Sequence, residues 1–367
     1  MLVILQVERT SYRRCALTLK DIAERARRDA TIPIAERDVE RALSALLASE
    51  DIWRVIDLSG VPVMALVRVL SALKETGFLD WDGGRLVLTP EGREFAESLG
   101  VGPKLELKCP HCGGRGTTLG PVDKIADKFK EIARDRPEAI QDYDQGYVTE
   151  ETTLHRVAFM WSRGDLFGKE LIVLGDDDLV SIAAGLTGAP KRIVVLEIDQ
   201  RLVDFIRDVA DKEKLPIEVK QHDLREPLSP DIKGKFDTFF CDPTESLRGF
   251  KVFAERGIAA LRGPGSAGYL GLTHCEASYG KWREIQRFFL DTGAVIAELR
   301  DAFHDYVNWP YIDHMRSWPH LPVHRIPGRD EIWYRSALIR IELVEGPHIQ
   351  ERRYEGDIFS DDEAATT

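Results

Sequence analysis

The stretch "KELIVLGDDDLVSIAAGL", residues 169–186, decides the fold class of this chain. Its apolar run at 171–174 predicts a buried strand, Gly175 predicts the turn that ends the strand, and "LVSIAAGL" predicts a helix. This order is typical of nucleotide-binding α/β folds, in which the turn is usually rich in glycine. Here Asp176, Asp177 and Asp178 occupy the turn instead. The ligand of such a turn must tolerate three neighbouring carboxylates.

Strand candidates alternate with helical segments after Arg163, which predicts crossover units and a parallel sheet. The strand candidates are "ELIVLG", "RIVVLEID", "IEVKQHD", "FDTFFCD", "AGYLGLTH", "AVIAELRD" and "SALIRIELV". Seven strands with a late antiparallel pair are typical of the sheet of methyltransferases and aminopropyltransferases. We therefore expect an α/β fold with a seven-stranded, Rossmann-like sheet.

The segments that flank this sheet predict further units. Residues 1–105 show helical apolar spacing followed by a hairpin signal, "FLDWDGGRLVLT", so we expect a winged-helix-like α+β domain there. We expect a Cys- and Gly-containing connector and helix over 106–145, and the Rossmann-like domain over 146–350. Residues 351–367 are acidic and lack apolar periodicity, which predicts a flexible tail. A lid over the ligand is the alternative for this tail.

Composition narrows the class of protein. A length of 367 residues favours two domains, and 31% charged residues is typical of a thermophile's surface. The net charge of −12 makes nucleic acid an unlikely partner and favours a cationic ligand. No stretch reaches the roughly 18 uncharged apolar residues of a membrane helix, and the N-terminal apolar run is too short for a signal peptide. We expect a cytoplasmic protein with no membrane partner.

Acidic side chains follow four of the predicted strands. They are Asp176, Asp177 and Asp178, then Glu197 and Asp199, then Asp223, then Asp242 and Glu245. Ligands of an open parallel sheet bind outside the carboxyl ends of the strands. Glu197 lies about 20 positions after Asp176, the spacing of the acid that binds ribose hydroxyls. Asp223 is placed to face an adenine amino group.

These acids also have a plainer interpretation, because Asp and Glu after a strand often form turns or cap helices. Capping is strongest for Asp199 and is also open for Asp178. A row of three carboxylates, however, would repel phosphate and any free carboxylate, so a dinucleotide is disfavoured. A ligand with an adenosine end and a cationic end fits the turn.

Several motifs together resemble one family. "VLGDDDLVSIA", "KFDTFFCDPTES", "YVNWPYID" and the upstream "YDQGYVTEETTLHRVAFMWSRGDL" are similar to those of the branched-chain polyamine synthases of thermophiles, the bis(aminopropyl)spermidine synthases. The resemblance covers nearly the whole chain. Strand four reads Asp-Pro-Thr where Asp-Pro-Pro is expected, but Asp242 is kept.

The resemblance implies a reaction. Decarboxylated S-adenosylmethionine, as co-substrate, donates an aminopropyl group to the secondary amine of spermidine. A second transfer to the same nitrogen gives a quaternary product, and methylthioadenosine leaves each time. The aspartate turn would then select a donor that has lost its carboxylate, because it repels the carboxylate of ordinary S-adenosylmethionine.

The site residues follow from the acids and from this resemblance. The candidate proton acceptors are Asp177 and Asp242, with Asp176 as a third candidate. Donor-binding candidates are Gly175, Asp176, Glu197, Asp199 and Asp223. Acceptor-binding candidates are Asp177, Asp178, Asp242, Glu245, Tyr147, Glu150 and His155. For the last three, a capped amphipathic helix packing on the sheet is the alternative.

Cys109 and Cys112, in "KCPHCGGRG", form half of a zinc site by spacing. Two subunits could each supply half, while a disulfide or two free thiols remain open. Cys15, Cys241 and Cys275 show no matching pair. The winged-helix analogy favours a homodimer.

Two other functions remain open. One is an amino methyltransferase that uses S-adenosylmethionine, because Asp-Pro-Thr resembles an Asp-Pro-Pro-Tyr motif. The other is a DNA-binding regulator that senses polyamines. The aromatic segment 308–320 could wall the methylenes of a polyamine, or pack as an ordinary loop.

Overall fold

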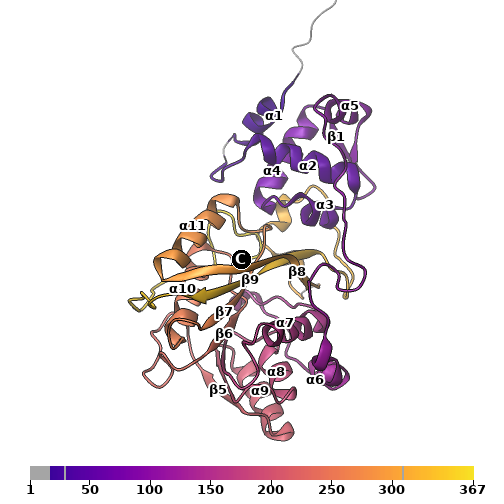
Figure 1. Cartoon of the computed structure of the whole chain (residues 1–367). Coiled ribbons are helices and arrows are strands. Elements are labelled where there is room, and N and C mark those ends of the chain that lie inside the picture. The colour runs from indigo at the N-terminus through magenta and orange to yellow at the C-terminus, as the bar shows by residue number, and fades with distance from the viewer. Residues whose placement is uncertain (1–16, 29, 308–309) are drawn as a thin grey trace, which may run out of the picture.

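A seven-stranded sheet forms the centre of the larger domain (Figure 1) in the computed structural model, which describes residues 17–28, 30–307 and 310–367. The strand order is β5-β4-β3-β6-β7-β9-β8. The first five strands of this order are parallel, and β9 runs antiparallel to both β7 and β8. The bounds are β3 (Glu170–Leu174), β4 (Arg192–Glu197), β5 (Ile217–Gln221), β6 (Thr238–Cys241), β7 (Ala267–Leu272), β8 (Ala294–Tyr306) and β9 (Tyr334–Leu343). The predicted seven-stranded α/β sheet is confirmed.

Helices cover both faces of the sheet (Figure 1). One face packs against α10 (Leu247–Ala260) and α11 (Tyr279–Asp291). The other packs against α6 (Ala126–Ala133), α7 (Glu150–Ser162), α8 (Val180–Leu186) and α9 (Gln200–Glu213). Successive side chains of a strand point to opposite faces. Ile172 and Leu174 therefore join the first core, and Leu171 and Val173 join the second.

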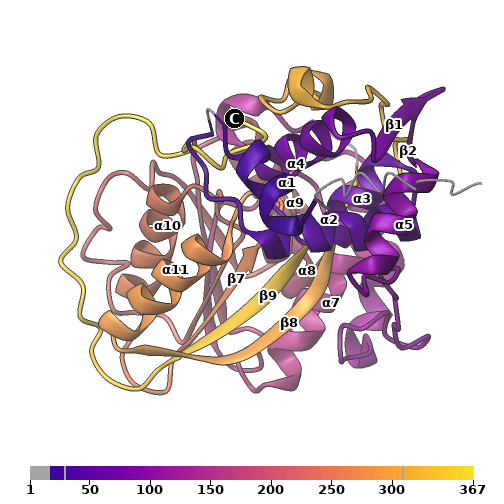
Figure 2. The same cartoon turned by 90° about the horizontal axis from the view of Figure 1, so that it is seen from above.

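The N-terminal domain contains α1 (Leu19–Ala26), α2 (Glu36–Ala48), α3 (Ile52–Ser59), α4 (Val63–Glu75), β1 (Leu79–Asp82), β2 (Arg85–Leu88) and α5 (Pro90–Ser98). The hairpin pairs Leu79 with Leu88, and Thr89 caps α5 by accepting from Gly92 N at 3.0 Å. The predicted helices and hairpin are present, and the winged-helix assignment stays a prediction. The domain lies over the β8–β9 side of the sheet (Figures 1 and 2).

Specific contacts join the two domains. Val63 N donates to Cys275 O at 2.7 Å, directly after β7. Trp53 Nε1 donates to Arg325 O at 2.8 Å, and the Arg335 guanidinium binds the carboxylate of Asp57. The N-terminal domain is thereby fixed next to the carboxyl end of β7 and the start of β9. Within the described residues, no single helix is long and apolar enough to cross a membrane, and the pair α3 and α4, bent by 114°, meets that test only through combined length and composition.

The C-terminal segment differs from the expected flexible tail. Residues 351–367 pass outside α10 and return to the carboxyl edge of the sheet (Figure 2). Ile358 is buried, Lys281 Nζ lies 3.0 Å from Asp361 Oδ1, and Ser278 Oγ donates to Glu363 Oε1 at 2.7 Å. Three acids of this segment, Glu351, Asp361 and Glu363, are thus paired or hydrogen-bonded by the domain, and its residues Ile358, Ala364 and Ala365 are buried.

Candidate active site

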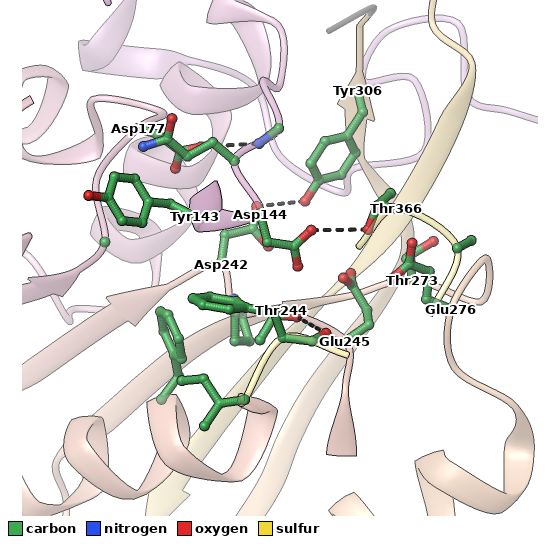
Figure 3. A pocket seen from close by; sticks show the side chains of 18 of the residues that line it. Tyr143, Asp144, Asp177, Asp242, Thr244, Glu245, Thr273, Glu276, Tyr306 and Thr366 are labelled. Atoms are coloured by element: carbon green, nitrogen blue, oxygen red, sulfur yellow. Dashed lines mark hydrogen bonds between the residues drawn. The ribbon is translucent and has the colours of Figure 1, made fainter. Parts of the chain in front are cut away.

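A cavity of about 1170 Å³, including its open mouth, lies at the carboxyl edge of the parallel strands (Figure 3). Seven carboxyl side chains line it: Asp144, Asp177, Glu197, Asp223, Asp242, Glu245 and Glu276. Of the described residues, no lysine or arginine belongs to the lining. Clustered carboxylates favour a cation. The cavity is therefore suited to a positively charged ligand.

One half of the cavity lies at the carboxyl ends of β4 and β5. Glu197 ends β4, and its carboxylate is fixed because Oε2 accepts from Asp176 N at 2.8 Å and Oε1 from Asp199 N at 2.9 Å. Burial raises the pKa of Glu197. Asp223 follows β5; burial acts to raise its pKa, but hydrogen bonds from Arg225 lower it overall. The lining between these acids includes the apolar side chains of Ile198, Leu224, Pro243 and Phe253.

Asp177 faces the cavity from the turn after β3. Its Oδ2 accepts from Gly146 N at 3.3 Å, and no ion pair to this carboxylate forms within the described ranges. Burial raises the pKa of Asp177 well above 3.8, and the charges of Asp178, Glu197 and Asp242 raise it further. A carboxyl in this state accepts a proton readily, or a cationic ligand that replaces the proton.

Asp242, at the end of β6, is held by two partners. The Arg156 guanidinium and the Tyr306 hydroxyl, at 2.6 Å, both donate to its Oδ2. Burial still raises the pKa of Asp242, while Arg156 opposes that rise. The adjacent strand must approach closely, since a Cβ on Gly271 would lie 1.9 Å from Asp242 Oδ1. Asp242 is therefore a fixed charge rather than a free one.

Arg156 was not predicted from the sequence. It lies on α7 with 1% exposure, and its other Nη donates to Asp178 Oδ2 at 2.6 Å. One buried guanidinium thus ties the turn after β3 to the end of β6. Because a buried guanidinium needs paired charge, Asp178 and Asp242 stabilise it in return.

Three further carboxyls lie beyond Asp242. Figure 3 shows Glu276 and Asp177 on opposite sides of Asp242 and Asp144. Glu276 is 3% exposed; its carboxylate forms no hydrogen bond of ordinary geometry with a described residue, although the Thr366 hydroxyl and the backbone amides of Ala365 and Thr366 act to lower its pKa. Burial and Glu276 raise the pKa of Asp144 to about 8, and burial also raises that of Glu245 well above 4.5. Lys281 Nζ lies close by and acts to lower the pKa of Glu245 and Glu276, but it donates to their backbone oxygens and pairs with Asp361. The carboxyls of this half therefore keep an excess of negative charge.

Three of the predicted aspartates lie outside the cavity lining. Asp176 is buried and accepts from Ser181 N at 3.2 Å, at the start of α8. Asp199 caps α9 by accepting from Arg201 N at 2.9 Å, which is the capping alternative. Asp178 is occupied by Arg156 and by Val148 N, at 2.9 Å. Its predicted role in binding amines is not supported, because its charge is already neutralised.

The three predicted residues near α7 also lie outside the lining. Tyr147 donates its hydroxyl to Pro137 O, Glu150 is the first residue of α7, and His155 is buried with Nε2 3.6 Å from Glu151. The alternative of a capped helix packing on the sheet fits these contacts.

Two acids of the cavity, Glu276 and Asp144, were not predicted from the sequence. Glu276 follows β7 just as the predicted acids follow the earlier strands. Asp144 lies within the "YDQGY" motif, in a loop whose position the sequence does not reveal.

In the aromatic segment 308–320, Ser317 lines the cavity and Trp318 packs on Trp53, whereas residues 308–309 lie outside the described part.

The predicted zinc site is not supported. Cys109 and Cys112 are free thiols, and the described residues hold no group of three or more His, Cys, Asp or Glu placed for a metal ion. Gly116 N donates to Cys112 Sγ at 3.4 Å. Cys241 and Cys275 are buried and free, and Cys15 lies outside the described residues.

The fold and the site are those of a Rossmann-like protein with a carboxyl-lined cavity at the ends of its parallel strands. Residues 124–366 match the family model described as the branched-chain polyamine synthase A C-terminal domain. The chain belongs to the branched-chain polyamine synthase family, as the sequence motifs predicted.

Named relatives agree over almost the full length. The chain is 49% identical to the N(4)-bis(aminopropyl)spermidine synthase of Thermus thermophilus, over 95% of this chain and 98% of that one. It is 45% identical to the enzyme of the same name from Thermococcus kodakarensis, over 95% and 100%. The crystal structure of the Thermus thermophilus branched-chain polyamine synthase, in complex with N4-aminopropylspermidine and 5'-methylthioadenosine, superposes with a TM-score of 0.88 at 48% identity, over 95% and 98% of the chains.

Proposed function

We propose that this protein transfers aminopropyl groups from decarboxylated S-adenosylmethionine to the secondary amine of spermidine, giving a branched polyamine and methylthioadenosine. The observation that carries the proposal is the cavity itself, with seven carboxyls and, among the described residues, no lysine or arginine in its lining. The ligands named for the Thermus thermophilus structure support the same assignment. A polyamine supplies the missing positive charge, and its methylenes suit the apolar lining.

The donor half gives each residue a role. Glu197 is placed to accept from the ribose hydroxyls, and Asp223 from the adenine amino group. Gly175 lines the cavity beside them with φ of 70°, a conformation that favours glycine. A donor that kept its carboxylate would bring a negative charge against Asp177, so the decarboxylated donor is preferred.

The chemical step is a direct displacement. The acceptor nitrogen forms a bond to the carbon beside the sulfonium, and the carbon–sulfur bond breaks. The electron pair of that bond stays on sulfur, which becomes the neutral thioether of methylthioadenosine. The nitrogen can attack only when unprotonated, so a carboxylate must first accept its proton. The second transfer starts from the tertiary amine, which again has to lose its proton before it attacks.

Asp177 is the better candidate for this proton acceptor. Asp242 accepts hydrogen bonds from Arg156 and Tyr306, and the guanidinium acts to lower the pKa that burial raises. Asp177 has no such partner, faces the cavity and has a pKa raised well above 3.8. Asp242 then holds charge near the reacting amine, while Glu245, Glu276 and Asp144 bind terminal ammonium groups and align the acceptor.

The test is turnover of the purified protein. Incubation with decarboxylated S-adenosylmethionine and spermidine should release methylthioadenosine and yield tertiary and then quaternary products, detected by chromatography and mass spectrometry. No methylthioadenosine would refute the proposal. Release of S-adenosylhomocysteine from ordinary S-adenosylmethionine would favour a methyltransferase, and specific DNA retention without turnover would favour a regulator. The homodimer stays a prediction, which sedimentation of the protein would check.

A further inference from the structure

The N-terminal domain supplies part of the cavity wall. Trp53, on α3, and Val63, the first residue of α4, both belong to the lining. Val63 N donates to Cys275 O at 2.7 Å, and Cys275 directly precedes Glu276. The N-terminal domain therefore meets the proposed acceptor half of the site, where Glu245 and Glu276 lie.

Trp53 is held rigidly in this wall. It is 1% exposed, and its Nε1 donates to Arg325 O at 2.8 Å. Arg325 in turn binds Asp51, the residue that caps α3, at 2.7 Å, and Glu331 at 2.6 Å. The Trp53 ring lies 4.9 Å from that of Trp333, edge to face. A side chain fixed by so many contacts cannot move aside for a longer ligand.

An aromatic row connects Trp53 with the reacting centre. The Trp333 ring lies 4.3 Å from Tyr334, and Tyr334 stacks on Tyr306 at 4.3 Å and 9°. Tyr306 donates to Asp242 Oδ2 at 2.6 Å. All four aromatic side chains line the cavity. The row gives the methylenes of an acceptor arm an apolar surface from Asp242 to the N-terminal domain.

The described part of the N-terminal domain adds no carboxyl to the cavity. Glu245 and Glu276 follow β6 and β7, whereas the described residues of the N-terminal domain add only apolar side chains, Trp53 and Val63, to the lining. A longer arm would carry its ammonium past Glu276 and against these side chains. That ammonium would lose its carboxylate partner and still have to be desolvated.

We propose that Trp53 is a specificity residue that limits the length of the acceptor arm, so that the N-terminal domain sets which polyamines are used. This inference rests on the proposed function. It deepens that function by assigning the choice of acceptor to a side chain outside the Rossmann-like domain.

The test compares triamines that share one aminopropyl arm and differ in the other. Norspermidine, spermidine and N-(3-aminopropyl)cadaverine carry second arms of three, four and five carbons. For the wild-type chain, we expect kcat/KM for methylthioadenosine release to fall on the order of tenfold from spermidine to the five-carbon arm, the discrimination of one methylene in a fitted pocket. In Trp53→Phe, the ratio of kcat/KM for the five-carbon arm to kcat/KM for spermidine should rise by about the same factor. The change should appear mainly in KM for the acceptor, with KM for the donor unchanged.

Two further variants keep the test decisive. Val63→Ala opens the same wall with a smaller change and decides the outcome if Trp53→Phe does not fold, as judged by thermal unfolding. Trp161→Phe is the matched control, because Trp161, on α7, stacks on Phe167 and lies outside the lining.

Two outcomes would overturn the inference while leaving the proposed function intact. One is an equal kcat/KM of the wild-type chain for spermidine and for the triamine with the five-carbon arm. The other is an unchanged ratio of these two kcat/KM values in folded variants that still use spermidine. Absence of methylthioadenosine from the wild-type chain with all three triamines would overturn the proposed function, and this inference with it.

Discussion

Replacing Asp177 by asparagine separates the proton acceptor from the other carboxyls of the site. The change keeps the shape of the side chain, and the amide oxygen can still accept from Gly146 N, 3.3 Å away in the wild type. Asp242 remains paired with Arg156 and Tyr306. Only the proton-accepting group is lost, so kcat should fall by about 10²–10⁴-fold, which is about 2.7–5.4 kcal/mol of activation free energy.

The pH dependence gives this prediction a second measurement. In Asp177→Asn, the acceptor has to lose its proton to solvent, so the residual rate should increase with pH as the neutral amine becomes more abundant. Initial rates of methylthioadenosine release, measured from about pH 6 to about pH 10, test this, because the pKa of an alkyl ammonium group such as that of lysine is about 10.4. A pH profile parallel to that of the wild type would refute the reasoning, as would a rate within a few-fold of it.

Stability should change in the opposite direction to activity. Burial and neighbouring carboxylates raise the folded-state pKa of Asp177 above 3.8, so the folded chain holds a proton that the unfolded chain releases above that pH. Wild-type stability at this site therefore falls as pH increases between the two pKa values. Asp177→Asn should raise Tm at neutral pH, and the gain should vanish below pH 3.8. Asp211→Asn, an exposed change on α9, is the control and should alter neither activity nor Tm.

Other changes probe the remaining parts of the site. Glu197→Gln should weaken donor binding on the order of tenfold or more with little effect on KM for spermidine, which calorimetry with methylthioadenosine checks; unchanged affinity would remove Glu197 from the ribose role. Arg156→Met leaves Asp178 and Asp242 buried without a cation and should cost about 3–5 kcal/mol of unfolding free energy; an unchanged urea midpoint would contradict the buried clamp. Glu276→Gln should raise KM for spermidine and leave donor KM unchanged, and the reverse pattern would argue against an ammonium site there. Chelator treatment should leave activity and Tm unchanged, because no metal-binding group is present in the described residues; stoichiometric zinc by elemental analysis would refute this.

The residue pattern alone predicts much of the framework. Apolar runs of strand length alternate with helical spacing, and this signal is local, so the seven strands of the sheet were predicted. The carboxyl ends of parallel strands meet at one edge, so acids that follow the strands gather there whatever the details of packing. For this reason Asp177, Glu197, Asp223, Asp242 and Glu245 were predicted, and all of them line the cavity.

The tertiary structure decided which carboxyls are free. Asp176, Asp177 and Asp178 are consecutive in a turn, so their side chains point in different directions. Asp176 accepts from Ser181 N at the start of α8, Asp177 faces the cavity, and Asp178 binds Arg156. No spacing rule predicts that pairing, because Arg156 lies 22 positions before Asp178 and on a different element. The same holds for Trp53, which reaches the cavity only because the two domains pack together. Local sequence determines where a strand ends, but the contacts between distant segments determine which of the charges at that end is left for a ligand.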